Sequence, residues 1–308
     1  MIVVVCPGQG SQTPGFLTPW LEMPEFASSI EAQQAASGID LVGFGTTADA
    51  DTIRDTKVAQ PLIVGAGVAT LAALLGDTPI AESGIAGVAG HSVGEITAAV
   101  ATGVFKPEDG IKFVRERGNA MAKAAALEVT SMAAVLGGEQ AIVEARLTEL
   151  GLEPANYNGG GQIVAAGSAE GIAALLATPP TGSRVIPLQV AGAFHTSYMA
   201  PAVETLEAYS QGVVVNDPAI SLWTNSGGRR VTSGAEFVSL LVSQVKSPVR
   251  WDLCMAAMVE AGVTAVIEVA PAGTLVGLAK RGMPGIETLA IKTPENLDAA
   301  RELIANHS

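Results

Sequence analysis

The chain has 308 residues, of which 48% are hydrophobic and only 15% are charged, and its 17 basic and 30 acidic side chains give a formal net charge of −13. A chain of this length can bury on the order of three-quarters of its unfolded surface, so it has room for one large or two modest domains. The composition excludes a disordered chain, and the acidic balance excludes generic attraction to nucleic acid or to an anionic membrane.

Three features of the sequence indicate where in the cell the protein is found: the N-terminus, one apolar stretch and the two cysteines. The first seven residues are apolar but carry no basic region and are too short for a signal sequence, so they predict a buried strand. The uncharged stretch 58–76 approaches membrane length, yet it contains Gln60 and Pro61 and precedes Asp77, so we expect no membrane span. Cys6 and Cys254 lie far apart without ligand spacing, which indicates neither a disulfide framework nor a metal site and favours a cytoplasmic protein.

Short apolar, β-branched runs alternate with longer amphipathic stretches along most of the chain. The predicted strands are residues 2–6, 85–89, 220–223, 265–269 and 289–291. This alternation is typical of an α/β protein with a mainly parallel sheet.

The order of predicted strands and helices changes between residues 128 and 190. The pattern there predicts strands at 131–136, 154–158, 162–167 and 184–190, and helices at 139–150 and 169–177. The order β-α-β-β-α-β is that of a ferredoxin-like unit. We therefore expect an α/β-hydrolase-like large domain formed by residues 1–127 and 191–308, interrupted by a ferredoxin-like small domain at 128–190, with the chain returning to the large domain near Ala191.

One motif indicates a nucleophile. The sequence Gly90-His91-Ser92-Val93-Gly94 fits G-x-S-x-G and lies between a predicted strand and a helical pattern, which is the setting of a nucleophile elbow. The glycines permit a strained turn that presents the Ser92 hydroxyl, and the helix N-terminus supplies free N–H groups for an oxyanion. A chance match is the alternative in a chain with 35 glycines, but the flanking strand and helix favour the functional interpretation.

A serine nucleophile needs a base, and the chain contains only three histidines. His307 adjoins the C-terminus, where fraying is expected, and His91 cannot easily fold back onto the neighbouring Ser92. His195 remains, at the point where the small domain returns to the large one, and sites are common at such interfaces.

No acidic residue flanks His195, so a Ser-His-Asp triad is not evident. The helix predicted at 234–246 must end before Pro248, which leaves its last carbonyls, including that of Gln244, without intrahelical partners. One of these carbonyls can accept a histidine N–H and fix its tautomer, which would make a dyad.

Arg117 interrupts the apolar face of a predicted helix. The residues on that face are Gly110, Phe113, Val114, Arg117 and Met121. One interpretation is that Arg117 snorkels to the helix edge; the other is that its guanidinium points into a pocket and binds a carboxylate through two parallel hydrogen bonds. Arg115 is expected to be solvated.

The loop Gly8-Gln9-Gly10-Ser11-Gln12 follows the first strand. It lacks the third glycine of G-x-G-x-x-G, and no G-K-[ST] follows, so a phosphate loop is not indicated. Its backbone N–H groups can still face the site as oxyanion donors.

Taken together, these motifs resemble the malonyl-CoA:acyl carrier protein transacylases of fatty acid synthesis. The resemblance rests on 7-PGQGSQ-12, 90-GHSVGE-95, Arg117 within 115-RERG-118, Asn156 within 156-NYN-158, Gly161-Gln162, Phe194-His195, Gln244 before Pro248, and 268-EVAP-271. It covers the chain from the first strand to about Arg281. Two departures, Cys6 and Ile96, stand where phenylalanine and tyrosine are frequent, and they affect the wall of the pocket only.

The resemblance implies a role for each matching residue. Ser92 would be the acylated nucleophile, His195 its base and the Gln244 carbonyl the group that orients the imidazole. The N–H groups of Gln9 and Val93 would form the oxyanion hole, Arg117 would hold the malonyl carboxylate, and Met121, Asn156 and Phe194 would line the acyl site. The substrates would be malonyl-CoA and a phosphopantetheinylated acyl carrier protein, with no metal or other cofactor, no nucleic acid and no membrane, and the enzyme would be a cytoplasmic monomer.

Three rival functions stay open at this point. An α/β-hydrolase esterase shares the elbow but is expected to have an HGGG-type loop, which this sequence lacks. A non-catalytic binding module tolerates loss of Ser92 or His195, and both are present. A polyketide acyltransferase is expected within a longer chain, whereas this one is expected to stand alone. For docking of the acidic carrier protein we expect local cations, with Lys280-Arg281 and Arg229-Arg230 as candidates.

Overall fold

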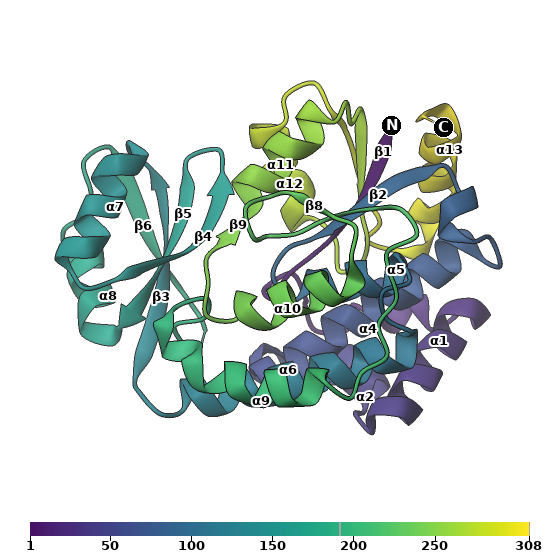
Figure 1. Ribbon diagram of the computed structural model, residues 1–308, viewed down its shortest axis with the longest axis horizontal. Helices are drawn as coiled ribbons and strands as arrows, with labels where there is room; N and C mark the ends of the chain where they lie inside the picture. Colours follow the sequence, from purple (N-terminus) through teal and green to yellow (C-terminus); the bar gives the residue numbers. More distant parts are fainter. Residues whose placement is uncertain (191, 308) are drawn as a thin grey trace.

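A computed structural model describes residues 1–190 and 192–307 of the chain. It has a mixed α/β fold with two sheets and many helices. In Figure 1 residues 130–188 form a separate layer on the left, while the first and last segments of the chain lie together on the right, with the two termini close to each other.

The larger sheet has the strand order β11-β10-β1-β2-β7-β8. Its strands are β1 (Ile2–Cys6), β2 (Ile85–Gly90), β7 (Ser221–Trp223), β8 (Arg230–Val231), β10 (Ala265–Glu268) and β11 (Glu287–Ala290). All neighbours pair in parallel except β7 and β8. Every residue of β1 is buried, as expected for a central strand covered by helices on both faces. The prediction of an α/β protein with a mainly parallel sheet is confirmed.

Helices cover this sheet and form most of the apolar core. They are α1 (Pro24–Ser37), α2 (Leu41–Thr46), α3 (Ala50–Arg54), α4 (Thr56–Leu75), α5 (Gly94–Ala101), α6 (Pro107–Ala125), α9 (Ala200–Ser210), α10 (Gly234–Gln244), α11 (Trp251–Glu260), α12 (Thr274–Gly282) and α13 (Leu297–His307), with short 3₁₀ turns at Thr18–Trp20, Ile80–Glu82, Ser197–Met199 and Pro294–Asn296. Of the described helices, α4 alone is long and apolar enough to cross a membrane, but 89% of its apolar window is buried inside the protein. It packs against α1, α5 and α6 as a core helix.

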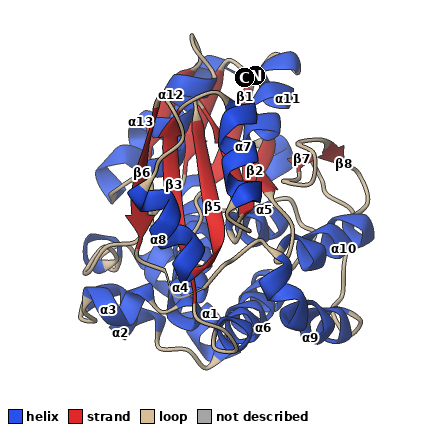
Figure 2. Cartoon of the chain, turned by 90° about the vertical axis from the view of Figure 1, so that its left-hand side faces the viewer, coloured by secondary structure: helices blue, strands red, loops and turns tan. Residues whose placement is uncertain are grey.

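The smaller sheet has the order β6-β3-β5-β4-β9. Its elements are β3 (Thr130–Gly137), α7 (Gln140–Glu149), β4 (Glu153–Gly159), β5 (Gln162–Ser168), α8 (Ala169–Ala177), β6 (Ser183–Leu188) and β9 (Val249–Arg250). Figure 2 shows α7 and α8 over one face of this sheet. Because side chains alternate along a strand, Ala133 and Val135 pack under these helices while Met132 belongs to the core shared with the larger layer.

The element order in this region is the predicted β-α-β-β-α-β, with antiparallel pairing of β3 with β5 and β6, and of β4 with β5. Two strands were not predicted: β8, and β9, which pairs in parallel with β4 and so adds a strand from a distant segment to the smaller sheet. The predicted return point at Ala191 lies outside the described residues.

Candidate active site

The candidate site lies at the carboxyl ends of β1, β2 and β7, where ligands commonly bind to parallel sheets. A cavity of about 100 Å³ opens there. Its lining comes from both layers of the fold: Gln9, Gln60, His91, Ser92, Met121, Met132, Asn156, Leu188, Val190, Phe194 and His195. The site is therefore formed between the two layers.

Ser92 sits on the turn between β2 and α5 in a strained conformation, with φ = 53°, which a residue with a side chain rarely adopts. The turn is closely packed: a Cβ at Gly90 would lie 2.1 Å from the Gly94 carbonyl carbon, and one at Gly94 would lie 2.1 Å from the Cys6 carbonyl oxygen. Both motif glycines are thus required by contact distance. The Ser92 N–H donates to Asn225 Oδ1 at 2.8 Å, which fixes the turn from the next strand of the sheet.

His195 meets Ser92 directly. Its Nε2 lies 2.7 Å from Ser92 Oγ, and its Nδ1 lies 2.8 Å from the Gln244 carbonyl oxygen at the end of α10. A carbonyl only accepts, so Nδ1 carries the proton and Nε2 is free to accept the hydroxyl proton of Ser92. His195 also has a positive φ of 62°, and its own N–H donates to the Val245 carbonyl. The elements of a serine–histidine dyad are in hydrogen-bond contact.

Burial, reinforced by the positive charge of Arg117, lowers the pKa of His195 to about 3. The imidazole is therefore neutral at physiological pH, the form that can take a proton. The other two histidines make other contacts: His91 lines the cavity but its Nε2 is hydrogen-bonded to Asn158 Oδ1 at 2.9 Å, and His307 contacts Thr264 and Glu287 away from it. Their positions agree with the elimination made from the sequence.

Arg117 is fully buried on α6, so it does not snorkel. One terminal nitrogen donates to Gln60 Oε1 and the other to Gln244 Oε1, each at 2.8 Å, and the second also lies 3.4 Å from Ser92 Oγ. Its Nε–H has no hydrogen-bond partner in the described part of the chain. Among the described residues no carboxylate lies within ion-pair distance of Arg117.

Burial lowers the pKa of Arg117 to about 10, which still leaves it cationic at neutral pH. The partners of this buried guanidinium are neutral amide oxygens, so no described residue in direct contact with it neutralises its positive charge. Its planar N–H donors match the two oxygens of a substrate carboxylate. Arg115, two residues away on a different side of α6, is partly exposed instead; it pairs with Glu116 and donates to the Ser37 carbonyl.

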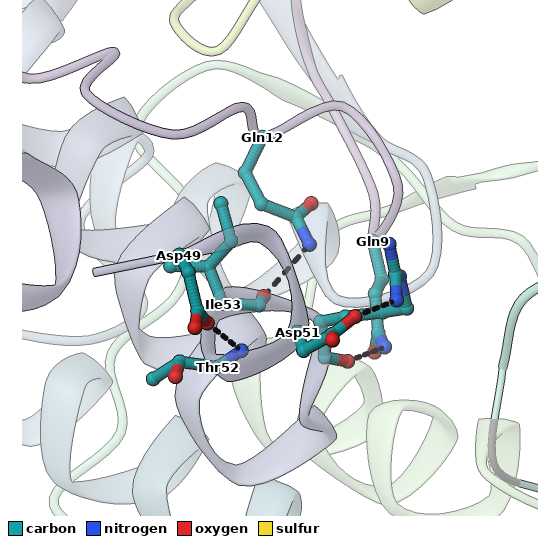
Figure 3. A network of polar contacts seen from close by, with 7 residues as sticks. Gln9, Gln12, Asp49, Asp51, Thr52 and Ile53 are labelled. Atoms are coloured by element: carbon teal, nitrogen blue, oxygen red, sulfur yellow. Dashed lines mark hydrogen bonds and ion pairs between the residues drawn. The ribbon is translucent and has the colours of Figure 1, made fainter.

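The residues expected to donate the oxyanion N–H groups, Gln9 and Val93, lie near Ser92. Val93 caps the N-terminus of α5, and Gln9 follows β1 and lines the cavity. The loop that carries Gln9 is held against α3: Gln9 Nε2 lies 3.4 Å from the Arg54 carbonyl, and Gln12 Nε2 lies 3.0 Å from the Ile53 carbonyl (Figure 3). A positive helix end and a fixed loop are a suitable setting for oxyanion donors.

The remaining predicted residues form the wall of the cavity. Met121, Asn156 and Phe194 all line it and are all at most 7% exposed. Asn156 comes from β4 of the smaller sheet, which explains how a residue distant in sequence reaches the site.

Three functional neighbours were not predicted: Gln60, Glu95 and Asn225. Gln60 was noticed only as an interruption of an apolar stretch, although a buried amide there is a signal that a polar partner is near. Glu95 directly follows the G-x-S-x-G motif and is 1% exposed. Asn225, also 1% exposed, follows β7 and leaves no local pattern in the sequence.

The cationic pairs proposed for docking lie away from this cavity. Arg229 pairs with Glu236 at 2.5 Å, and Arg281 contacts Gln162 of the smaller sheet. Both cysteines are buried. The described residues contain no group of three or more histidine, cysteine or acidic side chains that could hold a metal ion.

Comparison with known proteins is consistent with this geometry. The acyl transferase domain family matches residues 3–294. The malonyl CoA-acyl carrier protein transacylase of Mycobacterium tuberculosis is 47% identical, with 98% of this chain and all of the relative covered, and that of Haemophilus influenzae is 32% identical, with 98% of each covered. Among solved structures, MCAT from Mycobacterium tuberculosis superposes with a TM-score of 0.94 over 98% of this chain and 99% of that one at 47% identity. The acyl-carrier-protein-S-malonyltransferase from Bartonella henselae gives 0.92 over 99% of each at 30% identity.

Proposed function

This chain belongs to the malonyl-CoA:acyl carrier protein transacylases of the acyl transferase family, and from that premise we propose which of its residues carry the reaction. The enzyme transfers the malonyl group of malonyl-CoA to the phosphopantetheine thiol of acyl carrier protein, through a malonyl-serine intermediate, in fatty acid synthesis. The observation that carries the assignment is the contact of Ser92 Oγ with His195 Nε2 at 2.7 Å, beside the buried guanidinium of Arg117.

In the first half-reaction Ser92 is the nucleophile. Its Oγ attacks the thioester carbonyl of malonyl-CoA while His195 Nε2 takes the hydroxyl proton. The N–H groups of Gln9 and Val93 stabilise the oxyanion, and the Gln244 carbonyl stabilises the imidazolium through Nδ1–H. Collapse of the tetrahedral intermediate breaks the carbon–sulfur bond, and His195 returns the proton to the departing CoA thiolate. The products are the malonyl-serine ester and CoA.

The second half-reaction is the reverse sequence with the carrier protein. His195 takes the proton of the phosphopantetheine thiol, the thiolate attacks the ester carbonyl, and the oxyanion forms at the same donors. Release of Ser92 Oγ, protonated by His195, restores the enzyme and leaves malonyl-acyl carrier protein.

Arg117 selects the acyl group. Its guanidinium would bind the free carboxylate of the malonyl group and so hold the thioester carbonyl near Ser92, which joins recognition to positioning. Met121, Asn156 and Phe194 would form the wall around the acyl chain. This role is supported by the burial of Arg117 and by the neutral character of its two amide partners.

We further propose how the fold divides into domains, that the reaction needs no cofactor, and where the protein is found. An α/β-hydrolase-like large domain (1–127 and 191–308) with a ferredoxin-like insertion (128–190) is supported by the parallel order of the larger sheet and by the antiparallel β6-β3-β5-β4 order of the smaller one. The steps above use only side chains and backbone groups, so we propose that no metal or redox cofactor takes part. The net charge of −13 argues against binding to nucleic acid or to an anionic membrane, and the free cysteines Cys6 and Cys254 support a reducing, cytoplasmic setting. We propose a monomer, as the family resemblance implies.

A transfer assay tests the proposed roles against the hydrolase alternative. Purified enzyme, malonyl-CoA and phosphopantetheinylated carrier protein are mixed, and intact-mass spectrometry follows the carrier protein. We expect malonyl-carrier protein to form with the wild type and not with Ser92→Ala. Release of free malonate at the same rate, with no carrier product, would assign an esterase activity instead.

A further inference from the structure

We propose that Glu95, the first residue after the G-x-S-x-G motif, is a positioning residue that fixes the nucleophile turn, the base and the carboxylate-binding guanidinium through a single buried carboxylate. The inference rests on the proposed function, because it assigns to Glu95 the alignment of groups whose roles are given above. Glu95 itself does not reach the cavity and lies behind it, 1% exposed, on α5.

One arm of the network runs from Glu95 to the nucleophile. Glu95 Oε1 accepts the backbone N–H of Asn225 at 2.6 Å. The Asn225 side chain then joins both ends of the turn: its Oδ1 accepts the Ser92 N–H and its Nδ2 donates to the Gly90 carbonyl, each at 2.8 Å. The strained backbone of Ser92 is therefore held by an asparagine whose own position is set by Glu95.

The other arm runs from Glu95 to the base and the guanidinium. Glu95 Oε2 accepts the Gln244 side-chain Nε2, and the same amide presents its Oε1 to Arg117 at 2.8 Å. The backbone carbonyl of Gln244 is the group that accepts the Nδ1–H of His195. Gln244 thus positions both the base His195 and the guanidinium of Arg117. Its side-chain amide is oriented by the carboxylate of Glu95 on one side and by the cation of Arg117 on the other.

The charges agree with this reading. No described carboxylate contacts Arg117, so Glu95, one amide away, is the negative group linked to it through hydrogen bonds. The charged or titratable groups around Glu95 are Arg117 on α6, Cys254 on α11 and, beyond Arg117, His195; the Cys254 thiol stays neutral because burial raises its pKa. Burial raises the pKa of Glu95 to about 7 against the opposing hydrogen bonds and the charge of Arg117.

The ionised form of Glu95 accepts from Asn225 and Gln244 through charge-assisted hydrogen bonds, and these bonds are weaker when one carboxyl oxygen carries a proton. The pKa of His195 is far below this range, so its protonation does not obscure the change. In the wild type, kcat/KM for malonyl transfer should therefore rise through about pH 7 as Glu95 ionises.

The test compares pH profiles of kcat/KM from pH 5.5 to 8.5 in the wild type and in Glu95→Gln, a neutral side chain of the same length. We expect the variant to be slower by about tenfold to hundredfold at pH 8, the scale of a lost charge-assisted hydrogen bond, and the two curves to converge toward low pH. Glu95→Asp, which keeps the charge on a side chain one CH₂ shorter, should retain the pH step with a smaller loss, and it decides the matter if Glu95→Gln does not fold.

Glu268→Gln is the matched control. Glu268 is also a fully buried carboxylate, but it accepts the N–H groups of Gly273, Leu275 and Val276 at the start of α12 and contacts no residue of the site. Its variant should lose stability and keep the wild-type pH profile. Parallel profiles for wild type and Glu95→Gln, or convergence in Glu268→Gln as well, would overturn the proposal. Failure of the wild type to malonylate carrier protein at pH 8 would instead reject the proposed roles on which it rests.

Discussion

Replacing Arg117 with alanine should abolish most of the preference for malonyl-CoA over acetyl-CoA. A guanidinium that binds a carboxylate through two hydrogen bonds contributes about 1.5–3 kcal/mol for each bond, so the loss is about 3–6 kcal/mol. At 1.36 kcal/mol for each tenfold change in rate, kcat/KM for malonyl transfer should fall by about 10²–10⁴-fold. Acetyl-CoA has no free carboxylate, so its kcat/KM should change far less and the malonyl-to-acetyl ratio should collapse by a similar factor.

The variant also leaves Gln60 Oε1 and Gln244 Oε1 without the donor that each accepts from at 2.8 Å, which costs stability of about 1–3 kcal/mol for each buried oxygen. Kinetics should therefore be measured on enzyme whose folded fraction is known from a thermal melt. Arg115→Ala is the matched control, since Arg115 lies on the same helix but contacts Glu116 and the Ser37 carbonyl at the surface. An unchanged ratio in Arg117→Ala, or an equal change in Arg115→Ala, would refute carboxylate recognition by Arg117.

Three further outcomes are expected. His195→Ala should slow acylation by about 10²–10⁴-fold in a rapid-quench assay, the scale of a positioned general base, and a smaller effect would mean that another group takes the Ser92 proton. Phe194→Ser, which removes bulk from the cavity wall, should raise kcat/KM for methylmalonyl-CoA relative to malonyl-CoA by about tenfold to hundredfold, and equal ratios in wild type and variant would place selectivity elsewhere. Because burial lowers the pKa of His195 from 6.5 to about 3, the unfolded state binds the extra proton, so the free energy of unfolding should fall as pH drops through this window, by up to about 1.4 kcal/mol per pH unit. Urea melts at pH 4.5, 5.5 and 6.5 should show a shallower dependence in His195→Gln, and an equal slope would contradict the neutral assignment.

Much of the fold was accessible from hydrophobic periodicity. The helix predicted at 169–177 matches α8, because Ser168 caps its first turn and its apolar positions recur at helical spacing. The short strands β8 and β9 were missed because two residues carry no periodicity. Pairing of β9 with β4 is decided by tertiary contact, which a local pattern does not encode.

The residues of the candidate site likewise fall into two groups, those that the sequence indicated and those that only the structure revealed. Ser92 was identified from a local motif and His195 by elimination among three histidines. The end of a helix before Pro248 indicated several free carbonyls, and the family resemblance singled out that of Gln244. Glu95 belongs to the 90-GHSVGE-95 motif, but the sequence assigned it no role, and Asn225 left no local pattern, since the partners of both come from distant segments. Long-range hydrogen bonds are the part of the site that required the structure.

The most direct test of the account is the location of the acyl group during turnover. Wild-type enzyme is mixed with malonyl-CoA, quenched in acid within the first turnover, digested and mapped by peptide mass spectrometry, with a parallel sample that receives carrier protein before the quench. We expect a malonyl ester on Ser92 in the first sample and its transfer to the carrier thiol in the second. A malonyl group on Cys6 or Cys254, or malonylated carrier protein formed without any adduct on Ser92, would contradict the assignment of Ser92 as the nucleophile.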